Sequence, residues 1–347
     1  MASQVRETGW LEWIAGLMGA ASRQRHTAML APQRFHCLLD ELPLHLIPQP
    51  ALTRLWRYDF SQPLFLNPEC SVLPAGEVPP ELQANRQLLE GFGLDGTVAW
   101  VRDPAAGSFH PFWLGPELKA AVSHLRAGEP APTSLPEPQR FLLAAAGILT
   151  IADHAQQRLV DWTTVVNKTN QNFRERNYAP VGGLIHPFNL AALRRYYRCA
   201  IRRGAIRLGD EQSPRRYVAH NEPVARYFHH NIAKAIGTLA GEPIKPSYVY
   251  LASYLSGAEL KRHTDRQQCE LSVTLSLDFS PEPDLATSWP IRLDTANGTA
   301  TVYQALGDAL LYRGTQVPHY RDVLAEGHSS TSIFFHYVPE DFSGPLD

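Results

Sequence analysis

Two side chains in the second half of the sequence are placed to bind one metal ion. His263 and Asp265 are two positions apart in "YLSGAELKRHTDRQQCELSV", residues 254–273. Side chains two positions apart in an extended strand point to the same face, so the imidazole and the carboxylate should converge. A further ligand must come from a distant strand, and His319, which follows "GDALLYRGTQVP", is placed to supply it.

Two histidines and one carboxylate are the ligand set of many ferrous oxygenases. They occupy one face of an octahedral metal ion and leave three coordination positions open. Open positions suit Fe(II) when it must bind both a chelating cosubstrate and dioxygen. We therefore predict that His263, Asp265 and His319 are the metal ligands and the catalytic residues.

The elements that position these residues should be short strands. After residue 245 the hydrophobic period changes from helical to alternating, and glycine, proline and aspartate turns separate the runs. In "CELSVTLSL" the side chains of Val273 and Leu275 face one side, and those of Ser272 and Thr274 face the other. Many short strands at this spacing predict a sandwich or barrel of the jelly-roll type.

Two predicted helices precede the strands. In "HPFNLAALRRYYRCAIRRG" Asn189 is the expected N-cap and Gly204 the expected end. In "HNEPVARYFHHNIAKAIGTLAG" the helix should begin at an Asn221 cap, carry Pro223 in its first turn and end at Gly241.

The stretch 248–338 resembles the double-stranded β-helix core of the Fe(II)/2-oxoglutarate-dependent dioxygenases, in particular the prolyl-hydroxylase-like branch. Several features match in order: Tyr254 and then Gly257 before the metal pair, "RHTD" as the His-x-Asp pair, "GDALLYRG" as the strand before the distal ligand, and His319. The resemblance implies an α+β fold, with a jelly-roll catalytic core braced by helices and an N-terminal mixed helical domain. It also implies Fe(II) and 2-oxoglutarate as cofactors and O2 as a cosubstrate.

One position departs from the pattern of that family. There, an Arg or Lys nine or ten residues after the second histidine binds the far carboxylate of 2-oxoglutarate, and a small residue follows two positions later. Here His328 and Ser330 occupy these places, and an imidazole offers one charge-assisted bond where an arginine fork offers two. We assign Tyr254, His328 and Ser330 to the cosubstrate. The alternatives are that Arg313, Arg321 or Lys261 reaches this carboxylate from another strand, or that the cosubstrate is not 2-oxoglutarate.

The carboxylate of Asp265 limits the type of reaction that the resemblance implies. Halogenating relatives replace this residue with a small one, so the resemblance implies hydroxylation of a C–H bond. The expected substrate is a peptide or protein side chain, or an amino-acid-like metabolite. The residues expected to contact it are Arg262, Arg266 and Arg321. A metal-retaining peptide-binding module without turnover is the alternative, because the missing Arg or Lys would permit it.

Length and composition indicate a globular chain of more than one domain. It has 347 residues, of which 44% are hydrophobic and 19% charged. We predict an N-terminal domain at 1–127, with substrate or peptide recognition as its candidate role, and a proline-rich linker at 128–138. Residues 139–347 should hold the helices and the catalytic core, with core strands at about 246–338.

Other features limit the location and the partners. The net charge of −2 argues against nucleic acid as a partner. No run of about 18 apolar residues predicts a membrane span, and the four cysteines match no zinc or redox spacing. We therefore predict free thiols and a cytoplasmic protein. The stretch 9–25 should be a helix docked on its own domain, with a membrane or partner surface as the alternative.

One basic cluster could still bind an acidic peptide or phosphate groups. We expect it to be mainly the solvated face of the helix at 189–203. Its members are Arg194, Arg195, Arg198, Arg202, Arg203, Arg207, Arg215 and Arg216.

Overall fold

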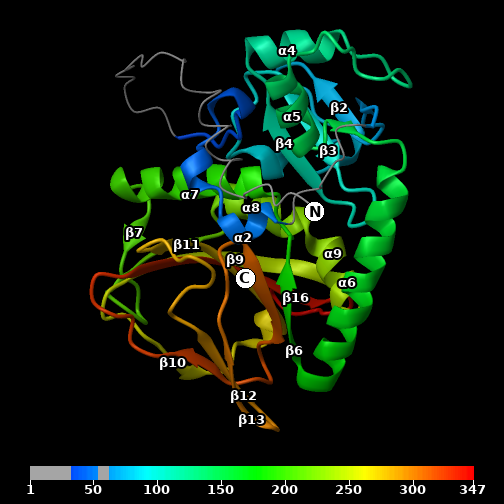
Figure 1. Ribbon diagram of the computed structural model, residues 1–347. Helices are drawn as coiled ribbons and strands as arrows, with labels where there is room; N and C mark the ends of the chain where they lie inside the picture. Colours follow the sequence, from blue (N-terminus) through cyan, green and yellow to red (C-terminus); the bar gives the residue numbers. More distant parts are fainter. Residues whose placement is uncertain (1–32, 54–61) are drawn as a thin grey trace, which may run out of the picture.

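Two antiparallel sheets built from the second half of the chain face each other, and a smaller sheet lies in the first half (Figure 1). The computed structural model describes residues 33–53 and 62–347. The predicted helix at 9–25 lies outside these residues. Within them, no helix combines the length and the apolar character that crossing a bilayer requires.

The first half of the chain is centred on a three-stranded antiparallel sheet with the order β2-β3-β4. The strands are β2 (Cys70–Leu73), β3 (Val98–Arg102) and β4 (Phe109–Trp113), and every residue of β4 is buried. The short strands β1 (Phe65–Leu66) and β5 (Leu149–Thr150) pair with each other. The helices of this half are η1 (Leu39–Glu41), η2 (Leu44–Leu46), α2 (Gln49–Leu52), α3 (Pro80–Gln83), η3 (Arg86–Leu89), α4 (Pro116–Ser123) and α5 (Glu137–Ala145).

Four helices follow, namely α6 (His154–Arg176), α7 (Pro187–Arg202), α8 (Pro223–Asn231) and α9 (Ala233–Ala240). Helices α7 and α8 lie between the small sheet and the two larger ones, and the long α6 runs along one side of the molecule (Figure 1).

The predicted helix caps at Asn189 and Asn221 are wrong. Helix α7 begins three residues earlier than an Asn189 cap implies, at Pro187, and its cap is His186, whose Nδ1 accepts from the Phe188 amide at 3.1 Å. Asn189 is buried inside the helix and donates to the Pro111 carbonyl at 3.0 Å. Proline fits the first helical position because its missing N–H would have no intrahelical partner there.

The second predicted helix is two helices. Its N-cap is Glu222, whose carboxylate accepts from the Ala225 amide at 3.0 Å, and Pro223 is the first helical residue as expected. The helix is interrupted at Ile232, which is the C-cap of α8 and the N-cap of α9. Helix α9 ends at Gly241, whose φ of 76° is the left-handed conformation typical of a helix C-terminus.

The larger sheet has seven antiparallel strands in the order β6-β14-β11-β16-β9-β8-β7. Their bounds are β6 (Tyr178–Gly182), β7 (Arg207–Leu208), β8 (Arg216–His220), β9 (Ile244–Leu255), β11 (Leu271–Ser280), β14 (Asp308–Arg313) and β16 (Ser329–Pro339). The facing sheet has the order β10-β15-β12-β13. Its strands are β10 (Leu260–His263), β12 (Ile291–Thr295), β13 (Gly298–Val302) and β15 (His319–Arg321), and η4 (Gln267–Cys269) leads from β10 to β11.

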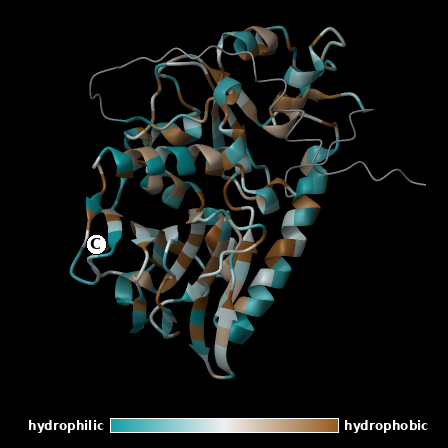
Figure 2. Cartoon of the chain, turned by 60° about the vertical axis from the view of Figure 1, so that its left-hand side comes forward, coloured by the Kyte–Doolittle hydropathy of each residue, from teal (hydrophilic) through white to brown (hydrophobic). Residues whose placement is uncertain are grey.

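The alternation predicted for β11 is confirmed. Val273 and Leu275 pack in the core shared with the helices, whereas Ser272 and Thr274 point to the opposite face. Figure 2 shows hydrophobic and hydrophilic residues alternating along the strands. One face of the large sheet is therefore closed by helices, and the other is available to build a polar site.

A single hydrophobic cluster links the two halves of the chain. It includes Phe35 and Trp100 from the first half, Leu190 of α7, Phe228 of α8 and Tyr337 of β16. These side chains are all buried. The division into domains at 128–138 stays a prediction.

The basic cluster on α7 is only partly a solvated face. Arg194 is fully buried, and its Nη2 lies 2.8 Å from Asp278 of β11 while its Nη1 donates to the Leu46 carbonyl at 2.7 Å. Arg198 also pairs with Asp278. A buried charge needs a partner, so these arginines join α7 to the large sheet.

Candidate metal centre

The structure brings the three predicted ligands together. His263 and His319 are directly opposite each other on the neighbouring strands β10 and β15, with ring centroids 4.4 Å apart. Oδ1 of Asp265 lies 3.5 Å from Nε2 of His263 and 3.6 Å from Nε2 of His319. One candidate ligand atom from each residue lies within 4.8 Å of the others. Adjacent strands therefore align the two imidazoles, and the turn after β10 adds the carboxylate.

Local backbone contacts set the direction in which both imidazoles offer a lone pair. Nδ1 of His263 is 2.7 Å from the Lys261 carbonyl, and Nδ1 of His319 is 3.0 Å from the Val317 carbonyl. A carbonyl can only accept, so each Nδ1 carries the proton and each Nε2 is free to bind a metal. Such contacts to the ring nitrogen that does not bind the metal are typical of histidine ligands.

The protonation of the three groups also fits a metal site. Burial raises the pKa of Asp265, but the neighbouring imidazoles of His263 and His319, which stabilise the ionised carboxylate when they are protonated, outweigh it and lower this pKa to about 2. Burial lowers the pKa of His319, and the hydrogen bond to Asp265 raises the pKa of His263. The site thus offers an ionised carboxylate, and it offers a neutral imidazole at His319.

Close approach of the backbone holds Asp265 in place. Its N–H donates to the Gly314 carbonyl at 2.8 Å, and a Cβ on Gly314 would lie 2.2 Å from Oδ2 of Asp265. The same Cβ would lie 2.7 Å from Oγ of Ser272. Only glycine fits at position 314 while the carboxylate keeps this orientation.

The ligands lie in the wall of a cavity of about 1480 Å³. Its wall also includes Tyr248, Tyr250 and Tyr254 of β9 and Phe334 of β16, all on one face of the large sheet. The cavity is larger than the usual range for a small-molecule site, which is about 300–1,000 Å³. A metal bound by these ligands would therefore stand at the edge of a space that holds a sizeable molecule.

Comparison with known proteins finds similarity in structure only. No family model matches the sequence, and no curated protein matches it. The structural resemblance is to Fe(II)/2-oxoglutarate-dependent oxygenases. A prolyl-4-hydroxylase from Pseudomonas putida is 16% identical, with a TM-score of 0.42 over 50% of this chain and 99% of its own.

Two further solved structures of this group cover a similar share of the chain. The non-haem α-ketoglutarate-dependent epimerase SnoN of nogalamycin biosynthesis is 14% identical, with a TM-score of 0.42 over 51% of this chain and 83% of its own. A 2OG-Fe(II) oxygenase family protein from Burkholderia pseudomallei is 13% identical, with a TM-score of 0.39 over 50% of this chain and 89% of its own.

The residues predicted to bind the cosubstrate are distributed differently. Tyr254 is buried and lines the cavity, and Ser330, its partner across β9 and β16, is buried but is not in the cavity wall. His328 lies in the turn before β16, outside the cavity wall, and its Nδ1 is 2.9 Å from the Glu326 carbonyl. Arg313 also lies outside this wall, and it pairs with Glu242 at 3.1 Å.

The three arginines predicted to contact substrate also differ in position. Arg262 pairs with Asp294 at 2.6 Å and does not line the cavity. Arg266 does line it, and its guanidinium lies 4.5 Å from the ring centroid of Tyr248. Arg321, two positions after His319, is buried behind the cavity and is not part of its wall.

Arg321 is a buried cation with uncharged partners. It is 5% exposed, donates to the Trp289 carbonyl and to the Gln304 amide oxygen, and stacks on the Trp289 ring at 4.9 Å. Within 33–53 and 62–347, no carboxylate forms an ion pair with it. Burial lowers the pKa of its guanidinium to about 10, against the opposing effect of the Tyr254 and Tyr312 phenols.

Sequence reasoning missed one polar network in the cavity wall. Arg216 of β8 donates through Nε to Asp210 at 3.0 Å and through Nη1 to the Tyr254 hydroxyl at 3.1 Å. The Tyr250 hydroxyl donates to the same Asp210 carboxylate at 2.6 Å. Arg216, Val218 and His220 alternate with the period of a strand, but this short run precedes the region assigned to the core.

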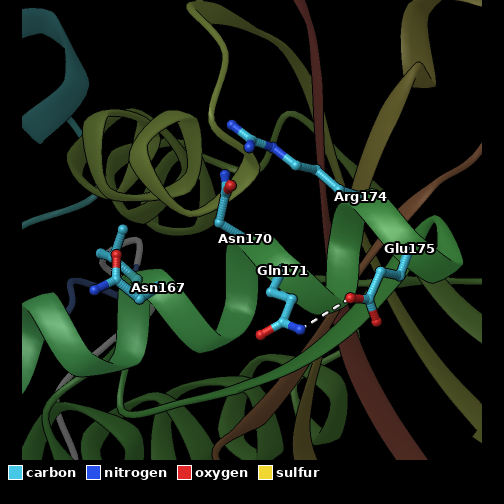
Figure 3. A pocket seen from close by; sticks show the side chains of 6 residues that line it. Asn167, Asn170, Gln171, Arg174 and Glu175 are labelled. Carbon is cyan, nitrogen blue, oxygen red and sulfur yellow. Dashed lines mark hydrogen bonds between the residues drawn. The ribbon is translucent and has the colours of Figure 1, made fainter.

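A second hollow, of about 570 Å³, lies along α6 (Figure 3). Asn170 and Arg174 extend from the helix on one side, and Gln171 donates to Glu175 at 2.9 Å on another. The Asn170 amide packs against Gly241, where a Cβ would lie 2.1 Å from it. These contacts join α6 to the end of α9 and bring no metal-binding or nucleophilic group together.

Proposed function

We propose that this protein is an Fe(II)- and 2-oxoglutarate-dependent oxygenase that hydroxylates a C–H bond of a peptide or protein side chain, or of an amino-acid-like metabolite. The observation that carries the proposal is the convergence of His263, Asp265 and His319 at the cavity wall, with both Nε2 atoms facing Oδ1 of the carboxylate. In this proposal the two facing sheets form a double-stranded β-helix.

The donor set suits ferrous iron. Two imidazoles and one ionised carboxylate from one side leave the opposite side free for a keto acid and oxygen. Bound iron and 2-oxoglutarate would supply the oxidising chemistry. The protein would bind both, orient the substrate and limit the access of water.

We infer that Arg321 holds the far carboxylate of 2-oxoglutarate. Support comes from its burial, its uncharged partners and its position two residues after His319. An unpaired cation is costly inside a protein, and an incoming carboxylate would compensate it. Tyr254 would assist, because its oxygen already accepts from Arg216 and its own O–H remains a donor. The exposed turn around His328 supports that residue less well.

The cavity mouth favours a substrate that carries negative charge. Four cations line the cavity without an ion-pair partner among the described residues, whereas Arg216 and Asp210 neutralise each other. The unpaired acidic groups in the wall, apart from the metal ligand, are Glu211 and Glu259. The four cations are Arg207, Arg215, Lys261 and Arg266.

The size of the cavity favours a peptide segment or a large metabolite over a single amino acid. We further propose that the first part of the chain, up to residue 127, contributes to recognition of such a substrate, and that the protein acts in the cytoplasm.

Anaerobic titration tests the proposed function. Fe(II) and 2-oxoglutarate together should give a weak visible charge-transfer band, and admission of air should release succinate. His263→Ala and Asp265→Ala should abolish both signals, while His124→Ala, a histidine at the end of α4 outside the cavity wall, should leave them unchanged.

Each result has a defined meaning. The absence of both the band and succinate in the unmodified protein would reject the oxygenase. Tight binding of metal and keto acid without any succinate would instead support the peptide-binding module.

A further inference from the structure

The second oxygen of Asp265 faces away from the imidazoles and has its own partners. Oδ2 accepts a hydrogen bond from Oγ of Ser272 at 2.8 Å. The same Oγ lies 2.9 Å from Nδ1 of His336. Ser272 of β11 and His336 of β16 are directly paired across the large sheet, and both are buried, with exposures of 1% and 6%. A continuous chain of polar contacts therefore leads from the carboxylate into the sheet.

The direction of the hydrogen bonds in this chain is fixed by proton count. An ionised carboxylate can only accept, so the single proton of Ser272 is donated to Asp265. Nδ1 of His336 must then carry a proton and donate it to Oγ. The Cys269 carbonyl, at 3.4 Å from Oγ, is a longer and weaker acceptor than the charged carboxylate. Burial lowers the pKa of His336 to about 4, which agrees with a neutral ring.

We propose that Ser272 and His336 are positioning residues that fix the Asp265 carboxylate for metal binding. His336 orients the Ser272 hydroxyl, and Ser272 holds Oδ2, so that Oδ1 alone is directed between the two Nε2 atoms. Gly314 closes the remaining side of the carboxylate. The inference rests on the metal centre of the proposed function and adds two residues to it that are not ligands.

A second metal ion is the competing explanation for this cluster. Candidate ligand atoms of Asp265, Cys269 and His336 also lie within 4.8 Å of one another. However, the Cys269 sulfur is 2.9 Å from the Tyr248 hydroxyl, and burial raises the pKa of the thiol to about 12. The Ser272 hydroxyl already bridges the other two groups. The geometry is therefore that of a completed hydrogen-bond network, and one metal ion per chain is expected.

Calorimetric titration of Co(II) into the full chain under argon tests the positioning role without any turnover. Ser272→Ala should weaken Co(II) binding by about 10- to 100-fold, the usual effect of removing a partner that orients a ligand. Ser272→Thr keeps the hydroxyl and should bind within about threefold of the unmodified protein. Ser276→Ala is the matched control, since Ser276 is also buried on the same face of β11 and does not contact Asp265; it should bind normally.

The positioning role of His336 is tested by the same titration. His336→Phe keeps a ring but removes the donor, and it should weaken Co(II) binding, whereas His336→Asn places an amide N–H near the position of Nδ1 and should restore much of it. The visible absorption of bound Co(II) should change in Ser272→Ala and His336→Phe and stay the same in Ser276→Ala. Circular dichroism and thermal unfolding establish that each variant folds. If Ser272→Ala does not fold, Ser272→Cys keeps the volume with a weak donor and should show the same loss.

The outcomes separate this inference from the proposed function. An unmodified protein that binds no Co(II) would reject the metal centre itself. Normal Co(II) binding by folded Ser272→Ala or Ser272→Cys would overturn the positioning role while the metal centre stands. Two Co(II) ions per chain, with one lost in Cys269→Ser, would overturn it in favour of the second metal site.

Discussion

Replacing Arg321 by methionine should separate the binding of metal from the binding of the keto acid. Methionine keeps an unbranched apolar side chain of similar length but has no charge and no donors. The proposed metal ligands are untouched, so Co(II) affinity should stay within about threefold. The variant should instead lose the electrostatic contact with the far carboxylate of 2-oxoglutarate.

The size of the loss follows from the environment of Arg321. At an effective dielectric constant of about 20, a cation and an anion about 4 Å apart attract by about 4 kcal/mol. Removing one partner of a buried, hydrogen-bonded charge pair costs about 2–5 kcal/mol. The affinity for 2-oxoglutarate should therefore fall by about 30-fold to a few thousand-fold.

The stability of the variant should change much less. Lowering of the guanidinium pKa to about 10 corresponds to a penalty of about 3 kcal/mol for the charged form, which methionine removes. The carbonyl of Trp289 and the amide of Gln304 lose a donor, which costs a similar amount. We expect the free energy of unfolding in urea to stay within about 2 kcal/mol.

The assay is calorimetric titration of 2-oxoglutarate into the Co(II)-loaded protein without oxygen. A keto acid without the far carboxylate, 2-oxobutanoate, should bind the unmodified protein and Arg321→Met equally. His328→Ala is the comparison variant, and its affinity for 2-oxoglutarate should change by less than about threefold. A large loss in His328→Ala together with normal binding by Arg321→Met would refute the assignment and return the role to His328.

Three other predictions concern the site, the pH dependence and the buried ion pairs. Gly314→Ala should abolish detectable Co(II) binding in the same titration, because the new Cβ would lie 2.2 Å from Oδ2 of Asp265; unchanged affinity would show that the carboxylate is not confined. Burial lowers the pKa of His110 to about 4 and that of His186 to about 3, so both stay neutral in the folded chain while the unfolded chain binds protons below about pH 6.5. These two histidines should therefore lower the stability as the pH falls, by about 4 kcal/mol between pH 7 and pH 5 in urea unfolding, and a flat profile would contradict this. Asp278→Ala should lower the free energy of unfolding by about 3 kcal/mol, because the buried guanidinium of Arg194 loses the carboxylate that accepts from both its Nε and its Nη2 and keeps only the half-exposed Glu282, and a change below 1 kcal/mol would argue against the pairing.

Local periodicity was enough to predict that His263 and Asp265 converge, and to predict the alternation of β11. His263 and Asp265 are two positions apart, so the strand geometry alone directs them to one side. Predicting that His319 joins them required only the order of the later strands. The contacts of Ser272 with His336 could not be predicted, since they depend on the register between two strands whose residues are 64 positions apart.

Spacing rules were less informative where a turn or a buried contact decides the position. The count from His319 reaches His328, but the turn before β16 directs that imidazole to its own backbone at Glu326. Arg216 belongs to β8, which pairs with β9 of the large sheet although it precedes residues 246–338, where the core strands were predicted. Asparagine is a common helix cap, but the side-chain amide of Asn189 instead donates a hydrogen bond to the buried carbonyl of Pro111.

The hydrophobic cluster that runs from Phe35 through α7 and α8 to Tyr337 has a practical consequence for studying recognition. Cutting the chain before α6 would uncover the apolar faces of α7 and α8, which pack on both sides. A shortened protein is then expected to aggregate, so lost activity would say nothing about substrate contacts. Exchanging exposed side chains on α4 and α5, with the cluster left intact, is the informative way to ask what the first half recognises.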